Sequence, residues 1–118
     1  MRRASGAVTL VGHASGPPLG IFTDADYYDD RCKLGRGDIV VLMTDGILEA
    51  IETDLAEMPR LSALVSETNG GSGAVHRSLL AHLASRQGDW QGDDMTLLSL
   101  ELLTDPGRPR PSNFQQSI

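Results

Sequence analysis

Five consecutive apolar residues, Ile39 to Met43, set the framework for any fold of this chain. Three of the five are β-branched, and a continuous run of this kind favours a β-strand buried on both faces. The turn signal Gly37-Asp38 precedes the run, and Thr44-Asp45-Gly46 ends it abruptly. Since 118 residues leave room for a single core, we expect Ile39–Met43 to be the central strand of one small domain.

Further strands are expected on both sides of this run. Ala7–Val11 is a short apolar and β-branched stretch that predicts a strand. Gly20–Thr23 and Tyr27–Leu34 are also expected to be strands, paired as a hairpin. Met95–Leu102 predicts the last strand, in which Leu98, Leu100 and Leu102 share one face.

Helices are expected between the two clearest strands. Ile47–Ile51 fits a short helical turn, and a helix entered through Pro59 has apolar residues at i, i+3 and i+4. A second helix follows the break Asn69–Gly73 and stops near Gly88. The apolar positions of the two helices are Leu61, Leu64, Val65, Val75, Leu79 and Leu83. This order predicts an α+β fold over residues 6–103, with an N-terminal tail at 1–5 and a disordered C-terminal tail at 104–118.

Charge and cysteine content exclude several classes of protein. The net charge is −6, and four of the ten basic residues lie in the expected tails, so nucleic acid is an improbable partner. One cysteine, Cys32, can form neither an internal disulfide nor a thiolate zinc site. No apolar run approaches the ~20 residues that cross a bilayer, and no secretory signal precedes the domain, so we expect a cytoplasmic protein without membrane contact. Because an acidic surface repels anions, any phosphate chemistry here requires a metal ion.

Two acidic positions follow or precede expected strands. Asp45 comes directly after Ile39–Met43, and Asp93-Asp94 lies just before the last strand. If the strands are neighbours, these carboxylates meet at one edge and form an oxygen-rich site suited to Mg²⁺ or Mn²⁺. The alternatives are that Asp45 caps a short helix beginning at Ile47 and that the paired acids lie in a solvated turn.

Four motifs in register resemble the SpoIIE-like branch of the metal-dependent protein phosphatases, relatives of protein phosphatase 2C. They cover nearly all of residues 16–102, and their order and rough spacing match that family. In this sequence the motifs are Gly16-Pro17-Pro18-Leu19-Gly20, Leu34-x-x-Gly37-Asp38, Thr44-Asp45-Gly46-x-x-Glu49-Ala50 and Asp93-Asp94-Met95-Thr96-Leu97-Leu98.

The resemblance implies an α/β/β/α sandwich with antiparallel strands, in which two divalent cations activate a water that attacks phosphoserine or phosphothreonine. Asp45 and Asp93 match metal ligands of the family. Asp94 is expected to support a ligand rather than bind the ion, and Gly46 to satisfy backbone geometry. For Glu49 we favour the structural role of a helix-start acid. The implied cofactors are Mg²⁺ or Mn²⁺, and the implied partner is a phosphorylated regulatory protein such as an anti-sigma factor antagonist.

The sequence also departs from the family pattern. The family domain opens with a Gly-Asp segment, whose Asp bridges the two metals, and a later Gly-His-Gly segment, and neither is present here. Gly12-His13-Ala14 lies too close to Gly16 to be the latter. We therefore expect the C-terminal portion of a catalytic domain, weakly active or inactive alone, with an uncovered apolar sheet face that promotes self-association. The rival interpretations are a non-catalytic phosphatase-like interaction module and an acidic cation-binding domain.

Overall fold

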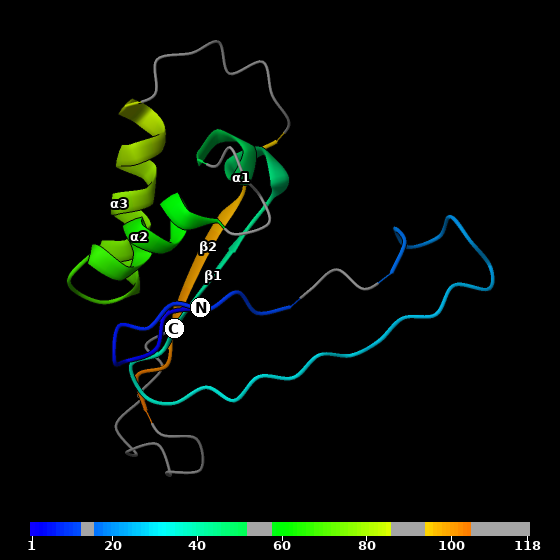
Figure 1. The fold of residues 1–118 in the computed structure, drawn as a ribbon, viewed down its shortest axis with the longest axis horizontal. Helices are drawn as coiled ribbons and strands as arrows, with labels where there is room; N and C mark the ends of the chain where they lie inside the picture. The colour runs from blue at the N-terminus through cyan, green and yellow to red at the C-terminus, as the bar shows by residue number, and fades with distance from the viewer. Residues whose placement is uncertain (13–15, 52–57, 86–93, 105–118) are drawn as a thin grey trace, which may run out of the picture.

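The part of the chain that the structure describes consists of a two-stranded sheet and three helices (Figure 1). The computed structural model describes residues 1–12, 16–51, 58–85 and 94–104. Along the chain the elements are β1 (Ile39–Met43), α1 (Asp45–Ile51), α2 (Pro59–Glu67), α3 (Ser72–Ser85) and β2 (Leu97–Glu101). The α+β class and the position of the helices before the last strand are therefore confirmed. The predicted stop at Gly88 and almost all of the predicted C-terminal tail lie outside the described residues.

The sheet pairs β1 with β2 in an antiparallel register that runs from Ile39 opposite Glu101 to Met43 opposite Leu97. β1 has the predicted bounds, and β2 is shorter than the predicted Met95–Leu102. A tight turn precedes β1, where Gly37 has a φ of 81°, a conformation that favours glycine. The Gly37 N–H donates to the carbonyl oxygen of Leu102 at 2.7 Å, which joins this turn to the end of β2.

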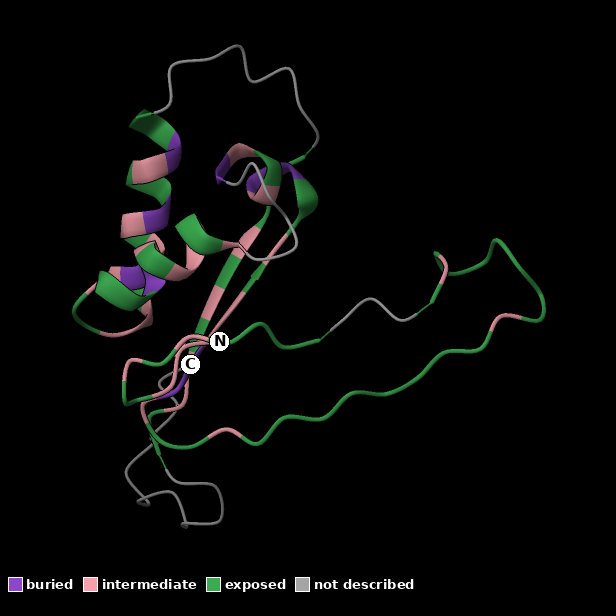
Figure 2. Cartoon of the chain, in the orientation of Figure 1, coloured by how far each residue is buried: buried purple, intermediate pink, exposed green. Residues whose placement is uncertain are grey.

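The core lies between one face of the sheet and the helices (Figure 2). α2 begins at Pro59, and its Val65 is buried while Leu61 and Leu64 pack at the edge of the core. Three residues of α3, spaced four apart as predicted, are buried in the same cluster. The fully or nearly fully buried side chains are Ile39, Ile47, Ile51, Val65, Val75, Leu79 and Leu83.

Among the described residues, no helix or strand covers the opposite face of the sheet, and only Met1, Val11, Cys32, Leu34 and their neighbours line a hollow beside Val40 and Leu42. Leu42 on β1 is 52% exposed, and Leu98 and Leu100 on β2 are 47% and 49% exposed. The expectation that β1 is buried on both faces is therefore wrong. Every described helix packs from the same side, so the side chains that alternate to the other side remain in contact with solvent.

The N-terminal residues depart from the predicted pattern. Ala7–Val11 does not form a strand, because Val8 makes only a single bridge to Arg2 before the chain turns away. Residues 1–5, expected to be a tail, pair with the body instead. Arg2 exchanges two 2.8 Å backbone hydrogen bonds with Ile39, and its guanidinium donates to the carbonyl oxygens of Val65, Thr68 and Gly70 at the end of α2.

The predicted strands at Gly20–Thr23 and Tyr27–Leu34 are also absent. This part of the chain is extended but unpaired, and Figure 1 shows it reaching away from the helices and the sheet. An isolated hairpin is marginal in water unless one face packs on something. Here Ile21 and Phe22 are each 63% exposed and Tyr28 is 72% exposed, so no packing surface supports the pairing.

Candidate metal-binding site

Asp45 is the first residue of α1 and follows β1 by two positions. The Thr44 carbonyl oxygen accepts the Ile47 N–H at 3.0 Å and the Leu48 N–H at 3.4 Å, so Thr44 is the residue that opens the helix. The helix therefore does not begin at Ile47 with Asp45 as its cap. Asp45 lies within the first turn of α1, where its negative charge complements the helix dipole. Asp45 is exposed, whereas Gly46 beside it is buried.

The Thr44 side chain joins the two strand ends that were expected to meet. Its Oγ1 donates to the carbonyl oxygen of Asp94 at 2.9 Å and accepts the Thr96 N–H at 2.9 Å. The Thr44 N–H also donates to the carbonyl oxygen of Thr96 at 3.1 Å. The structure thus brings the residue before Asp45 into contact with the segment that carries Asp94, across 50 residues of sequence.

Thr44 is the residue at this edge to which sequence reasoning assigned no role. It belongs to the Thr44-Asp45-Gly46 motif, but neither apolar periodicity nor carboxylate spacing assigns it a role. The signal that points to it is the placement of two threonines at the neighbouring strand ends, one in each acidic motif. A hydroxyl both donates and accepts, so one threonine can connect two backbone groups of a facing segment.

The two described carboxylates at this edge are free of internal partners. Within residues 1–12, 16–51, 58–85 and 94–104, the side chains of Asp45 and Asp94 make no hydrogen bond or ion pair. Both residues are exposed. Such carboxylates retain all their oxygen lone pairs and can coordinate a hard cation.

Glu49 does not have the role favoured from the sequence. α1 begins at Asp45, which is the only acidic residue of its first turn, and Glu49 follows four residues later on an exposed surface. Positions i and i+4 of a helix are neighbours on one face, so Glu49 adds a second negative charge beside Asp45. The helix-start role therefore belongs to Asp45.

Asp93, the other predicted ligand, lies outside the described residues and immediately precedes Asp94. In the described part of the chain, no three residues of the types His, Cys, Asp and Glu gather closely enough to hold a metal ion. The described residues Asp45 and Asp94 thus fit only part of a cation site. Their carboxylates are donors of the type that Mg²⁺ and Mn²⁺ prefer.

Asp38, at the opposite end of β1, shows what a structural carboxylate looks like in this fold. It is buried and accepts hydrogen bonds from the Gly35 N–H at 2.9 Å, the Arg3 guanidinium at 2.7 Å and the Ala4 N–H at 2.9 Å. These donors, first the Gly35 amide and then Arg3, lower the pKa of Asp38 to about 2. All its partners are internal, so Asp38 holds the turn before β1 and is not available to a ligand.

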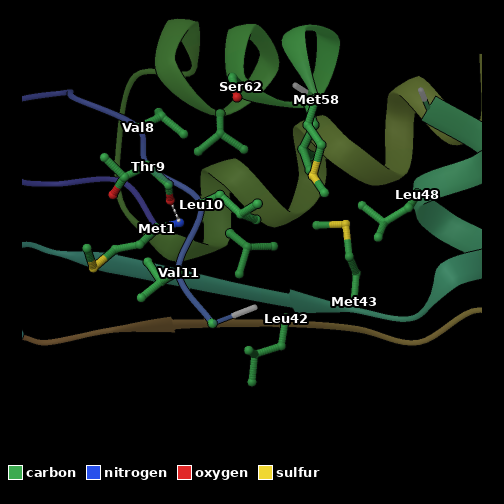
Figure 3. A pocket seen from close by; sticks show the side chains of 14 residues that line it. Met1, Val8, Thr9, Leu10, Val11, Leu42, Met43, Leu48, Met58 and Ser62 are labelled. Carbon is green, nitrogen blue, oxygen red and sulfur yellow. Dashed lines mark hydrogen bonds between the residues drawn. The ribbon is translucent and has the colours of Figure 1, made fainter. Parts of the chain in front are cut away.

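A pocket of about 400 Å³ lies on the helix side of β1 but does not suit a phosphate or a metal ion (Figure 3). Its walls come from β1, α1, α2, Met1 and the segment 8–12; none of the lining side chains is acidic or basic, and the Met1 α-amino group in its wall donates to the Thr9 carbonyl oxygen at 2.8 Å. Met43, Met58 and Leu61 are among its apolar lining residues. The pocket is therefore separate in chemistry from the carboxylate edge at Asp45.

Comparison with known proteins identifies the family. Among the described helices, none is long and apolar enough to cross a membrane. The searches of curated proteins and of solved structures return no match. The family model described as Stage II sporulation protein E (SpoIIE) matches residues 1–103, which include every strand and helix described above. This chain therefore belongs to the SpoIIE family of PPM-type phosphatases.

Proposed function

We propose that this chain is part of a Mg²⁺- or Mn²⁺-dependent phosphatase that hydrolyses phosphoserine or phosphothreonine on a signalling protein in the cytoplasm. In this proposal the sheet and its helices are one half of an α/β/β/α sandwich, as the family fold implies. The observation that carries the proposal is the pair of 2.9 Å hydrogen bonds through Thr44 Oγ1, which join the residue beside Asp45 to the segment of the second acidic motif.

The proposed metal ligands are Asp45 and Asp93. Asp45 starts α1 directly after a strand, so rigid backbone holds its carboxylate at the sheet edge. Asp93 precedes Asp94, whose carbonyl oxygen is bonded to Thr44. Asp94 supports the position of Asp93, and buried Gly46 lets the chain turn from strand to helix without a side chain in the core.

The chemistry follows from the charges of the chain. When bound, divalent cations lower the pKa of a coordinated water and neutralise the phosphate that it attacks. Without them, a protein of net charge −6 with two free carboxylates at the site repels a phosphate dianion. The carboxylates of this chain would hold the cations in place and supply the negative charge that binds them. No side chain is required as a nucleophile.

The substrate that we propose is a small phosphorylated regulatory protein, an anti-sigma factor antagonist being the example that the family suggests. Such a substrate presents its phosphorylated serine or threonine on a folded surface. An exposed edge, as at Asp45, gives a protein-borne phosphate access that an enclosed pocket does not.

A second candidate function is a phosphatase-like module that binds a partner protein and does not hydrolyse phosphate. In this case Asp45 and Asp93 are relics of the phosphatase fold and bind no metal. The observation that favours it is the uncovered sheet face, on which Leu42, Leu98 and Leu100 are each about half exposed. The two functions differ in whether metal binding and turnover depend on the same carboxylates.

The deciding experiment measures Mn²⁺ binding by isothermal titration calorimetry and phosphate release from a phosphothreonine peptide in the same samples. Asp45→Asn and Asp93→Asn are compared with the original chain. Asp29→Asn is the matched control, since Asp29 is an exposed aspartate of the extended segment. We expect each ligand variant to weaken Mn²⁺ binding at least about tenfold, while the control binds as the original chain does.

Equal Mn²⁺ uptake by the original chain and Asp45→Asn would remove Asp45 from the ligand set. Because part of a catalytic domain can bind metal without turning over, metal binding is the deciding readout, and unchanged Mn²⁺ binding in both Asp45→Asn and Asp93→Asn would favour the non-catalytic module. Phosphate release lost together with metal binding in both variants supports the phosphatase.

A further inference from the structure

The apolar pocket of about 400 Å³ on the helix side of β1 lies between the sheet, α2 and the segment 8–12 (Figure 3). Pockets of roughly 300–1,000 Å³ are typical of small-molecule sites. In the sandwich that the family fold implies, a second sheet covers the other face of β1 and β2, so this pocket does not belong to the seam between two sheets. Its size and place are those of a site for a small ligand beside the core.

The walls of the pocket limit the chemistry of its ligand. None of the lining side chains is acidic, basic or aromatic. A charged ligand would therefore lose its hydration without gaining an ion pair with a side chain, and a flat ring would find no ring to stack on. Val41, Leu48 and Leu61 instead offer dispersion contacts to a chain of methylene groups.

Two hydroxyl groups are the polar side chains of this pocket. Thr9 and Ser62 line it, and among the residues that the structure describes neither side-chain oxygen makes a hydrogen bond. Ser62 on α2 is half-buried, whereas Thr9 is exposed. A hydroxyl both donates and accepts hydrogen bonds, so Ser62 can bind the hydroxyl group of a ligand that has left water.

Met58 is the strained residue of the pocket. It stands directly before α2 with φ 46° and ψ 48°, a left-handed conformation that is uncommon for methionine, and its side chain makes no capping hydrogen bond. Asparagine would suit both this backbone and the start of a helix. Met58 instead extends a flexible thioether into the pocket toward Met43 of β1 (Figure 3). Strain of this kind gathers at ligand sites, and methionine adapts its shape to what it contacts.

We propose that this pocket binds a small uncharged amphiphile, namely an aliphatic chain that ends in a hydroxyl group. The chain lies between β1 and α2 against Met43 and Met58, and its hydroxyl group bonds to Ser62. This site is separate from the metal ligands and does not rest on the phosphatase proposal. For a ligand as small as 1-octanol, we expect a dissociation constant on the order of 0.1–1 mM.

The methionine methyl groups report on this pocket directly. Of the four methionines in the chain, Met1, Met43 and Met58 line the pocket, whereas Met95 does not and is 40% exposed. The full chain, labelled with ¹³C in its methionine methyl groups, is titrated with 1-octanol by NMR without added metal. We expect the resonances of Met43 and Met58 to follow one saturable curve while that of Met95 stays unchanged. The absence of a saturable shift, or the same curve at Met95, would overturn the site.

Octanoate tests the charge of the ligand, because it has as many carbons as 1-octanol but ends in a carboxylate. We expect octanoate to bind at least about tenfold more weakly, since no cationic side chain lines the pocket. Burial lowers the pKa of the Met1 α-amino group in the wall, which weakens this group as a partner for an anion. Octanoate that binds as tightly as 1-octanol, or more tightly, would overturn the uncharged class of ligand.

Substitutions on α2 locate the ligand. Ser62→Leu fills the pocket, and Ser66→Leu makes the same change at an exposed position of α2 outside it. We expect Ser62→Leu to weaken 1-octanol binding at least about tenfold and Ser66→Leu to leave it unchanged; equal binding by the two variants would overturn the pocket. Ser62→Ala keeps a small side chain and removes only the hydroxyl, so binding should weaken about three- to tenfold. Unchanged binding in Ser62→Ala would overturn Ser62 as the partner of the ligand hydroxyl.

Discussion

Replacing Thr44 by valine tests whether one side chain holds the two acidic segments together. Valine has almost the same shape and suits an extended backbone, but it can neither donate to the Asp94 carbonyl oxygen nor accept the Thr96 N–H. Each net hydrogen bond contributes about 0.5–1.5 kcal/mol. Both bonds are exposed, and water replaces part of what is lost, so we expect a destabilisation of about 1–2 kcal/mol.

The measurement is unfolding in urea, monitored by circular dichroism. The dependence of the unfolding free energy on urea concentration should have the same slope in every variant. The expected loss lowers the melting temperature by about 4–8 °C for each kcal/mol. Thr68→Val is the control, because Thr68 Oγ1 makes one hydrogen bond, to the Leu64 carbonyl oxygen at 2.6 Å, away from the strand ends. It is expected to cost about half as much as Thr44→Val.

The same two variants separate stability from metal binding. Thr44→Val frees the segment that carries Asp94 and is expected to weaken Mn²⁺ binding several-fold, whereas Thr68→Val is expected to leave it unchanged. If Thr44→Val matches the original chain in both unfolding free energy and Mn²⁺ binding, the argument that Thr44 organises this edge is refuted.

Three further predictions concern the fold. The pKa of Asp38 is lowered from 3.8 to about 2, so its contribution to stability is present above about pH 4 and is lost as the pH falls toward 2. Urea midpoints measured between pH 2 and 6 should show this loss. In Asp38→Asn this pH dependence should be absent. Leu79→Ala leaves a cavity at a fully buried position and should lower the free energy of unfolding in urea by about 2–5 kcal/mol. Leu80 is exposed, so Leu80→Ala should lower it by less than about 1 kcal/mol. Equal effects of the two substitutions would contradict the core described above. Gly71→Ala places a Cβ against Glu101 Oε2 and displaces the carboxylate from the start of α3. A cost of about 1 kcal/mol in urea unfolding is expected, and this cost should shrink when Glu101→Ala is already present.

Elements with strong local signals were predicted well. β1 has the predicted bounds because five apolar residues lie between two turn signals, and these are properties of the local sequence. α2 begins at the predicted Pro59, and the buried residues of α3 have the predicted spacing. In the two helices, the pattern of apolar side chains also identifies the face that packs.

Elements that depend on a partner strand were predicted poorly. Ala7–Val11 and Tyr27–Leu34 have the composition of strands, but a strand also requires a second segment in register and a surface to cover one face. Val8 has only the bridge to Arg2, and the extended segment has no paired neighbour among the described residues. The composition of a segment does not show whether a second segment lies beside it to form the backbone hydrogen bonds of a sheet.

The candidate site shows the same division. The sequence identifies Asp45 and Asp93 through their motifs, while the role of Thr44 emerges only when its hydroxyl is placed between Asp94 and Thr96. Family membership likewise rests on motifs of the linear sequence, and the match extends over residues 1–103.

Local sequence patterns were enough to predict the α+β class, the helices, the bounds of the strand Ile39–Met43 and the acidic motifs, because periodicity and turn residues act within a few positions of the chain. The prediction that this strand is central is not met, since the described sheet has two strands. The packing of the whole chain settles which face of the sheet the described helices cover and which described segments remain unpaired. It also revealed that Arg2 binds the end of α2 and that Thr44 joins two strand ends. These features depend on residues 50 or more positions apart being brought into contact, and that contact is set by how the whole chain packs.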